Sequence, residues 1–120
     1  MRNMQNKRVW NNWLSGAVVV AAVGTTAMGQ CEPTLLSSYD TPNLASAVFI
    51  SGTTAFVADD LRGIGGLRII DITDPTQPAL LGSYDTPGYA HDVFVSGTTA
   101  FLADGESGLQ IIDVTDPTQP

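Results

Sequence analysis

Residues 98–116 read TTAFLADGESGLQIIDVTD, and they restate with small changes the stretch TTAFVADDLRGIGGLRIIDITD at residues 53–74. Both stretches combine a short apolar run, an acidic and glycine-rich loop, a second apolar run and a Thr-Asp turn. Short apolar runs separated by turn residues are typical of β-strands, and no helical periodicity follows Glu32. The sequence therefore predicts an all-β repeat.

The repeat extends on both sides of this stretch. Residues 35–59 match residues 80–104 at an offset of 45, with 18 of 25 positions identical. Residues 67–78 match residues 109–120 at an offset of 42, with ten of twelve identical. The three-residue difference lies in the glycine-rich stretch, which indicates a surface loop between two strands.

Each unit is predicted to hold four short strands. They are expected at Leu35–Tyr39, Ser46–Ile50, Thr54–Ala58 and Leu67–Ile72, and again at Leu80–Tyr84, His91–Val95, Thr99–Ala103 and Leu109–Val114. Asp-Thr-Pro, Ser-Gly and Thr-Asp-Pro-Thr-Gln-Pro supply the turns. The second and third strands are unbroken apolar runs, as expected for strands covered on both faces. The fourth strand alternates in part, so Arg68 and Gln110 are expected to be exposed.

A period of about 40–45 residues with four strands is typical of a β-propeller blade. Propellers have about 4–8 blades, so two blades predict an incomplete ring. No third Ala-Leu-Leu-Gly-Ser-Tyr follows the second unit. The last blade is therefore expected to lack its closing outer strand, while Leu35–Tyr39 is an outer strand without a blade of its own.

The strand Leu67-Arg-Ile-Ile-Asp71 and its copy Leu109-Gln-Ile-Ile-Asp113 are each followed by Thr-Asp-Pro. Together with the preceding Ser-Gly-Thr-Thr-Ala-Phe-Val/Leu-Ala-Asp, this pattern resembles the LVIVD repeat family over residues 35–120. The signature positions are Leu67, Ile69, Ile70, Asp71, Asp74, Pro75, Leu109, Ile111, Ile112, Asp113, Asp116 and Pro117. The resemblance implies a β-propeller-like protein, commonly exported or surface-located, without an established general activity and without catalytic residues to carry over. From the repetition itself, Asp71 and Asp113 are expected to cap the turn that follows each strand.

The N-terminal residues predict export. Residues 1–13 are basic, residues 14–24 form an apolar run of eleven, and residues 25–29 are small. This order is typical of a secretory signal peptide over residues 1–29. The alternative is an uncleaved membrane anchor. The run is shorter than the ~20 residues of a membrane span, which argues against this alternative. Cleavage after Gly29 would begin the mature chain at Gln30 and place it outside the cytoplasm, secreted, periplasmic or at the cell surface.

The predicted organisation after the signal peptide is a short lead at residues 30–34 and two repeats at residues 35–79 and 80–120. Cys31 is the single cysteine, and Gln30 precedes it where lipoprotein signals have a small residue. It is therefore a free thiol or an intermolecular disulfide donor rather than part of a disulfide framework, and lipidation remains a weaker alternative.

The charge distribution limits the partners. Beyond residue 31 the chain has two basic residues, Arg62 and Arg68, against twelve acidic ones. Nucleic acids and anionic membranes are bound through Lys and Arg, so neither is expected as a partner, and the membrane is involved only through the signal segment. Further repeats of the same protein, other copies of this chain, or an unknown extracellular ligand remain as partners.

No residue set predicts catalysis or a cofactor. Asp104 and Glu106 are weak calcium candidates in a loop that lacks the usual ligand spacing, and a hairpin loop is the simpler interpretation. Ser107 and the glycines from Gly63 lack the strand-to-helix context of a nucleophile elbow or a dinucleotide loop.

Tyr89, His91 and Asp92 differ most between the two units, which makes them possible ligand-facing residues. A His beside a carboxylate can act in acid–base chemistry, but a structural histidine at a blade end is the simpler interpretation. Three functions stay open: an exported binding or surface-scaffolding repeat protein, a fragment of an extracellular enzyme whose site lies beyond Pro120, and a two-blade unit that closes a ring by homo-oligomerisation.

Overall fold

The computed structural model describes residues 32–120. The predicted signal segment, Gln30 and Cys31 lie outside the described residues, so the structure does not bear on cleavage or on the state of this thiol. Among residues 32–120 there is no helix with the length and apolar character needed to cross a membrane. The compact unit that carries the repeats spans Leu35–Pro120.

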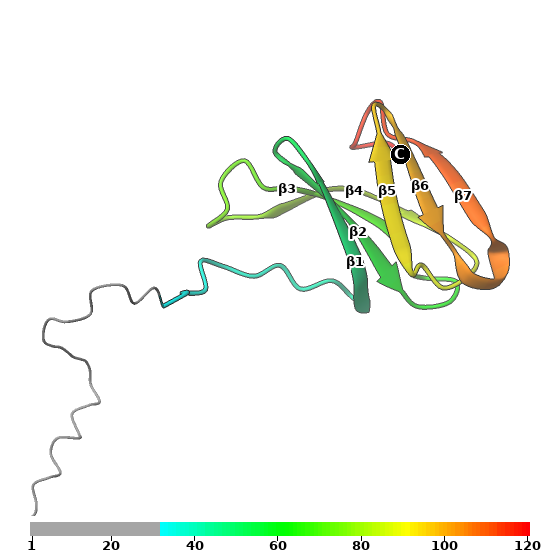
Figure 1. The fold of residues 1–120 in the computed structure, drawn as a ribbon, viewed down its shortest axis with the longest axis horizontal. Helices are drawn as coiled ribbons and strands as arrows, with labels where there is room; N and C mark the ends of the chain where they lie inside the picture. The colour runs from blue at the N-terminus through cyan, green and yellow to red at the C-terminus, as the bar shows by residue number, and fades with distance from the viewer. Residues whose placement is uncertain (1–31) are drawn as a thin grey trace, which may run out of the picture. The chain divides into compact units, whose positions relative to one another are not determined.

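This unit is built from two antiparallel sheets (Figure 1). The first has the order β1-β2-β3-β4 and the second the order β5-β6-β7, so each is a meander of sequential strands. The strands are β1 (Leu44–Ser51), β2 (Thr54–Asp60), β3 (Gly66–Asp71), β4 (Ala79–Asp85), β5 (Asp92–Ser96), β6 (Thr99–Ala103) and β7 (Leu109–Asp113), with a 3-10 turn η3 (Gly105–Ser107) between the last two. The predicted all-β, propeller-like fold is confirmed, with four strands in the first sheet, three in the second and an incomplete ring.

The hairpins form where the turn residues predict them. Gly52 and Gly97 each follow the first strand of a sheet with φ of 59°, a left-handed conformation that favours glycine. The pairs Ser51–Thr54 and Ser96–Thr99 flank these two-residue loops. The connections between β2 and β3 and between β6 and β7 are both five residues long, and the three-residue difference lies in the strands, because β2 is two residues longer than β6 and β3 is one residue longer than β7.

The prediction of a strand at Leu35–Tyr39 is wrong for this chain, because the segment pairs with no strand of the described residues. Its copy in the second repeat does form a strand, β4, which closes the first sheet against β3. A lone extended segment cannot satisfy its backbone hydrogen bonds as a strand, so two sequences that differ at one position form a strand in one place and stay unpaired in the other.

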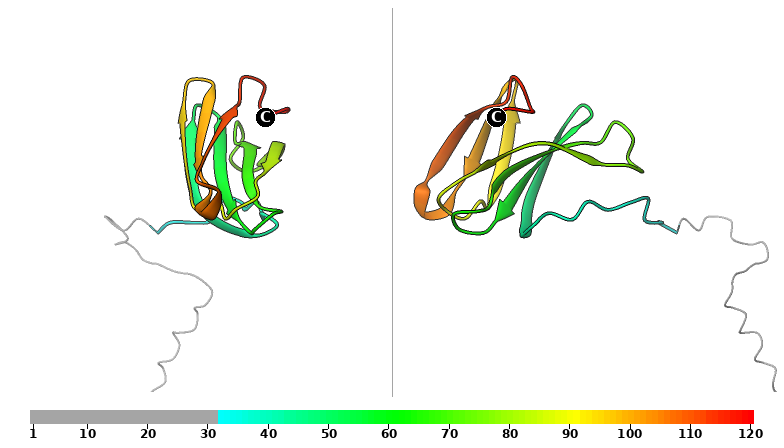
Figure 2. Two further views of the ribbon diagram at one scale, coloured as in Figure 1. Left: turned by 90° about the vertical axis from the view of Figure 1, so that its right-hand side faces the viewer. Right: turned by 180° about the vertical axis from the view of Figure 1, so that it is seen from behind.

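The two sheets pack face to face through one hydrophobic core (Figures 1 and 2). Which strands are buried on both faces depends on the packing of the two sheets and not only on the apolar runs in the sequence. β2 is buried on both faces as predicted, but β1 is not, because Val48 and Ile50 are 60% and 52% exposed. These side chains point away from the second sheet, on a face of the first sheet that has no full cover.

Candidate functional site

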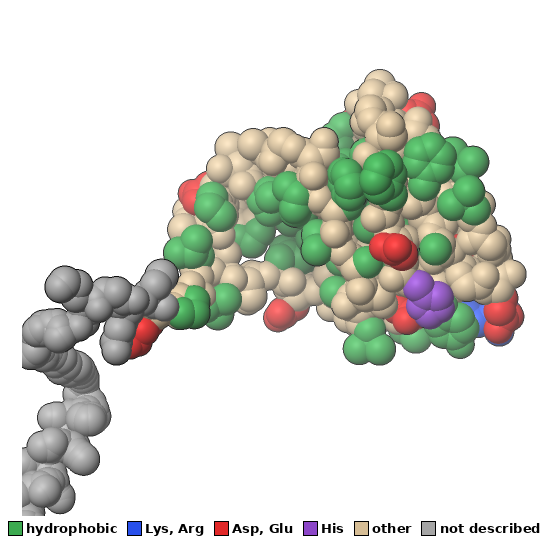
Figure 3. Space-filling view, viewed as in Figure 1, with side chains coloured by type: hydrophobic (Ala, Val, Ile, Leu, Met, Phe, Trp, Pro, Cys, Tyr) green, Lys and Arg blue, Asp and Glu red, His purple; other side chains and the backbone are tan. Residues whose placement is uncertain are grey.

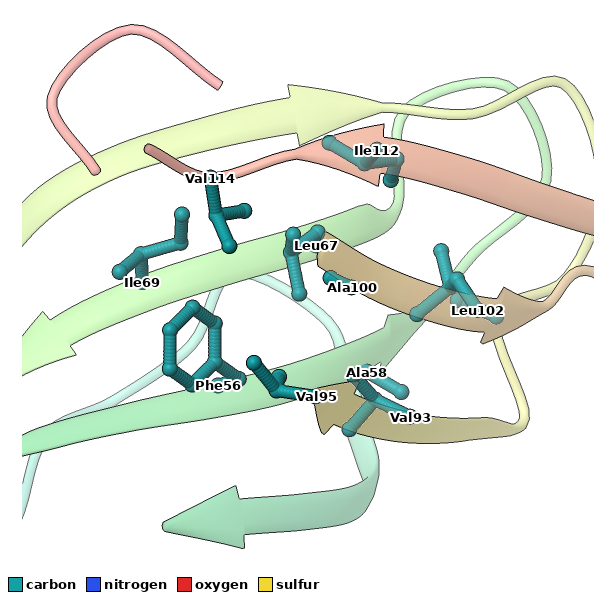
Figure 4. Close-up of a cluster of buried hydrophobic side chains, with 11 residues drawn as sticks. Phe56, Ala58, Leu67, Ile69, Val93, Val95, Ala100, Leu102, Ile112 and Val114 are labelled. Atoms are coloured by element: carbon teal, nitrogen blue, oxygen red, sulfur yellow. The ribbon is translucent and has the colours of Figure 1, made fainter. Parts of the chain in front are cut away.

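Each sheet has two different apolar faces, which we call the leading face and the trailing face. The leading face of the first sheet carries Phe49, Phe56, Ala58, Leu67 and Ile69. The trailing face of the second sheet carries Val93, Val95, Ala100, Leu102 and Ile112. These two faces pack against each other and form the main core, in which the side chains meet between the sheets (Figure 4). The contact between repeats is therefore leading face to trailing face.

The leading face of the second sheet is open. It carries Phe94, Phe101, Ala103, Leu109 and Ile111, of which Phe94, Leu109 and Ile111 are 58%, 61% and 64% exposed. A shallow hollow lies on this face, and hydrophobic side chains are visible over β5 to β7 (Figure 3). Phe94 also contacts Phe49 of the first sheet, with ring centroids 5.0 Å apart. Contiguous exposed apolar surface is a common feature of interaction sites.

The trailing face of the first sheet is only partly covered. It carries Val48, Ile50, Ala55, Val57 and Ile70, and the last three are buried beneath Tyr39 and beside Ile72. A second hollow lies beside Tyr39 on this face. The two-sheet unit thus has one open leading face at one end and one partly open trailing face at the other.

A buried carboxylate recurs at the end of the central hairpin of each repeat. In the first repeat Asp59 is fully buried, and its Oδ2 accepts hydrogen bonds from Arg68 Nε at 3.1 Å and from Asn43 Nδ2 at 3.0 Å. Arg68 also donates to Asp85 Oδ1 at 2.9 Å and to the Ile64 carbonyl at 2.8 Å. The prediction that Arg68 is exposed is wrong: the residue is 6% exposed, since its three acceptors compensate the burial of its charge.

The second repeat satisfies the equivalent carboxylate without a cation. Asp104 is fully buried and accepts hydrogen bonds from the Thr86 hydroxyl and from the Gly88 backbone N–H. Gln110 stands in the place of Arg68 and donates instead to the Ser107 carbonyl at 2.9 Å. Both carboxylates therefore fasten the segment that enters the first strand of their own sheet.

The signature aspartates cap turns. The Asp71 carboxylate accepts from the Thr73 backbone N–H at 2.8 Å and from its hydroxyl at 2.6 Å, and Asp113 does the same with Thr115. A second cap of the same kind follows in each repeat, in which Asp74 accepts from Thr76 and Asp116 accepts from Thr118. The threonine hydroxyl first, and then its backbone N–H, holds the pKa of each of these four carboxyls below its ordinary value.

The ligand-facing candidates lie at one end of the seam between the sheets. Tyr89 stacks on His91 with ring centroids 6.3 Å apart and an interplanar angle of 13°. His91 Nδ1 lies 3.4 Å from Asp60 Oδ2, so the histidine links the two repeats. The Asp92 carboxylate turns to its own strand and accepts from the Val93 backbone N–H at 2.9 Å. The structure therefore brings Tyr89 and His91 together with Asp60, which the sequence did not single out.

The two weak calcium candidates face different surroundings. Both oxygens of Asp104 are occupied by Thr86 and Gly88, whereas the exposed Glu106 carboxylate lies 3.6 Å from Arg62 Nη2. Within residues 32–120 no group of three or more His, Cys, Asp or Glu side chains has the geometry to hold a metal ion.

The open leading face and the ion pair of Asp59 with Arg68 are the features that sequence reasoning missed. The signal for the open face was present, because Phe94, Phe101, Ala103, Leu109 and Ile111 are identical to the five residues that the first sheet packs into the core. No sequence signal showed the ion pair, since the prediction treated a charged residue in a strand as solvent-exposed.

Each of the two antiparallel sheets is built from one copy of the same repeat, and the two pack leading face to trailing face around a shared core. This arrangement defines a β-propeller-like repeat protein. The profile of the LVIVD repeat matches residues 44–86 and 87–120, and the chain belongs to the LVIVD repeat family, a structural repeat rather than a known catalytic family. The first match spans the four strands of the first sheet, and the second spans the three strands of the second. Comparison with curated proteins and with solved structures gives no match.

Proposed function

We propose that the chain is an exported, non-catalytic repeat module with a binding or surface-scaffolding role, which acts by stacking its sheet faces with further repeats or with other copies of itself. The observation that carries this proposal is the open leading face of the second sheet. Its five residues are identical to those that the first sheet buries against a trailing face. A surface that already has a demonstrated partner within the chain is suited to bind a second partner of the same kind.

The other end of the unit offers the complementary surface. Most trailing-face positions carry apolar side chains in both sheets, as in Val48 and Val93, which are identical, or Ile50 against Val95. The exception is Arg68 of the first sheet, which Gln110 replaces in the second. Full burial of a side chain such as Phe94, Leu109 or Ile111 contributes roughly 1.5–3 kcal/mol, so covering this face would supply much of an association free energy. A leading-to-trailing contact is heterologous, and repeated contacts of this type close into rings or extend as filaments.

The chemistry of the carboxylates supports a structural rather than a catalytic role. Asp59 and Asp104 are buried and hydrogen-bonded to their own repeats, and the signature aspartates cap turns. Neither group stands free in a pocket beside a nucleophile. Tyr89 and His91 offer an accessible aromatic surface at the seam, which is the surface we propose for contact with an extracellular ligand.

Export is supported by the basic, apolar and small-residue order of the first 29 residues. Expression of the full sequence in a secreting host tests it directly. We expect the protein outside the cytoplasm with Gln30 as its first residue by N-terminal sequencing. Recovery of the chain in the cytoplasm with its first residues intact would contradict this part of the proposal.

Stacking is tested by the molar mass of the chain in solution, measured by light scattering over a range of concentrations. We expect the wild-type chain to self-associate. Leu109→Glu places a charge on the open leading face and should yield a monomer with an unchanged circular dichroism spectrum. Gln119→Glu introduces the same charge on an exposed turn and is the matched control. A wild-type monomer at all concentrations, or equal association of both variants, would refute stacking between copies.

A further inference from the structure

The segment Leu35–Asp40 is a second copy of the outer strand β4. It reads LLSSYD against LLGSYD at Leu80–Asp85. β4 pairs with β3 in an antiparallel register that places Tyr84 opposite Leu67 and Ser83 opposite Arg68. The segment Leu35–Asp40 has no strand partner among the described residues, and Leu35 and Leu36 are 84% and 66% exposed. The chain thus presents a strand sequence that has a known pairing mode and no partner.

Among residues 32–120 the second sheet has no strand that corresponds to β4. β7 is the copy of β3, and within residues 32–120 it pairs only with β6, so its other edge has no partner among these residues. Leu109 and Ile111 on β7 are exposed. An open, apolar strand edge is a template for pairing with another chain. The unpaired segment Leu35–Asp40 is thus the copy of β4, and the strand with the open edge, β7, is the copy of β3, the strand with which β4 pairs.

The segment already lies where an outer strand of a preceding sheet would lie. Ser37 Oγ donates to the Pro75 carbonyl at 2.6 Å. The equivalent residues of the other repeat are Gly82 and Pro117, and Gly82 lies in close contact with the Pro117 carbonyl. Residues of the unpaired segment thus contact the first repeat as residues of β4 contact the second. Tyr39 adds to this contact by packing on the trailing face of the first sheet.

The turn that follows this segment, at Thr41, leaves one buried acceptor atom of the first repeat without a hydrogen bond. Asp59 Oδ1 is buried and has no hydrogen-bond partner, whereas both oxygens of the equivalent Asp104 are satisfied. In the second repeat the Thr86 hydroxyl supplies the missing bond. Its copy in the first repeat, Thr41, donates instead to the Asn43 carbonyl at 3.2 Å. A buried acceptor without a partner is costly, which favours a rearrangement that satisfies it.

We propose that the Leu35–Asp40 segment of one copy pairs antiparallel with the open edge of β7 in a second copy and completes its four-stranded sheet. The register is that of β4 on β3, which sets Tyr39 opposite Leu109 and Ser38 opposite Gln110. The segment directly precedes β1 of the first sheet. One copy therefore supplies both contacts: its Leu35–Asp40 segment pairs with β7 of the second copy, and the trailing face of its first sheet covers the open leading face of that second copy. Once the strand is held, the Thr41 hydroxyl turns to Asp59 Oδ1, as Thr86 binds Asp104. This inference rests on the proposed self-association and adds the element and the register that hold the copies together.

Disulfide trapping tests the register. Residues opposite each other in an antiparallel sheet have Cα atoms about 4.5–5.5 Å apart, which is within reach of a disulfide. Full-length chains with Cys31→Ser would carry Ser38→Cys in one preparation and Gln110→Cys in the other, and the two would be mixed and oxidised. Ile111→Cys is the matched control, because a shift of one residue directs the side chain to the other face of the sheet.

We expect a reducible heterodimer of S38C with Q110C in at least tenfold excess over S38C with I111C. A third chain with both S38C and Q110C should form mixed-chain disulfides, identified by mass, rather than a bond within one chain. Light scattering on the C31S chain separates the possible failures. Self-association without the preferred crosslink, or an intrachain bond, would overturn strand exchange and leave stacking intact. A monomer that gives no crosslink would overturn both.

Discussion

Asp59 Oδ2 lies 3.1 Å from Arg68 Nε on the adjacent strands β2 and β3, and both side chains are buried. Asp104, the equivalent of Asp59, is satisfied without a cation because Gln110 replaces the arginine. Two copies of one repeat thus stabilise the same buried carboxylate in different ways.

Removal of the arginine should therefore affect only the first repeat. Arg68→Met leaves the Asp59 charge buried without a cation, and loss of one partner of a buried pair costs about 3–5 kcal/mol. Gln110→Met removes a half-buried side chain whose hydrogen bond goes to the Ser107 carbonyl and not to Asp104, and it should cost less than about 1 kcal/mol. Urea denaturation followed by circular dichroism measures both values, and equal losses would contradict the difference between the two repeats.

The Thr86 hydroxyl is expected to matter more than the Thr41 hydroxyl. Thr86→Val removes a donor to the buried Asp104, and a hydrogen bond to a charged group contributes about 1.5–3 kcal/mol. Thr41→Val removes a longer bond to a backbone carbonyl in a less buried place and should cost about 1 kcal/mol or less. The free energies of unfolding of the two variants, measured at a concentration where the chain is monomeric, should differ in this order.

The two equivalent isoleucines of the signature strand provide a test of which faces are covered. Ile69 is fully buried and Ile111 is 64% exposed. Ile69→Ala should lower the free energy of unfolding of the monomer by about 2–5 kcal/mol, while Ile111→Ala should change it by no more than about 0.5 kcal/mol. A large loss for Ile111→Ala at low concentration would show that the leading face of the second sheet is covered within one chain.

The Asp–Thr caps predict a dependence of stability on acid pH. The pKa values of Asp71, Asp74, Asp113 and Asp116 are lowered from the ordinary 3.8 because the threonine hydroxyls and backbone N–H groups bind the charged form. A carboxyl whose pKa is lower in the folded chain contributes stability above its unfolded value, and this contribution is lost as pH falls through the folded value. Stability should therefore decline below pH 3.8.

Thr73→Val and Thr115→Val test the cause of this shift. Each removes the hydroxyl that is the largest contributor, so the pKa of Asp71 or Asp113 should rise toward its ordinary value. Titration of the aspartate carboxyl signals by NMR measures the change. Thr53→Val alters an exposed threonine outside these caps and should leave the four pKa values unchanged.

The sequence predicted the strands well wherever the partner of a strand is its neighbour in the chain. The Ser-Gly hairpins and the signature strands lie within two residues of their expected places. Leu35–Tyr39 was wrongly predicted as a strand because pairing requires a second edge, and its sequence differs from that of a true strand only at Ser37, where β4 has Gly82. Arg68 was wrongly predicted as exposed because its acceptors, which lie 4, 9 and 17 residues away in the chain, are brought around it only by the folded sheet. The contact of His91 with Asp60 likewise depends on how two sheets meet, which no local pattern determines.

The difference between the leading and trailing faces has a consequence for how such chains change in length. A duplication that copies one unit of 42 or 45 residues copies both halves of an interface at once. The new unit is compatible with its neighbours on either side from its first appearance, and no fresh surface has to evolve. Loss of a unit from a longer chain likewise leaves faces that match each other. Chains of different unit number can therefore arise from one ancestor while selection maintains a single contact.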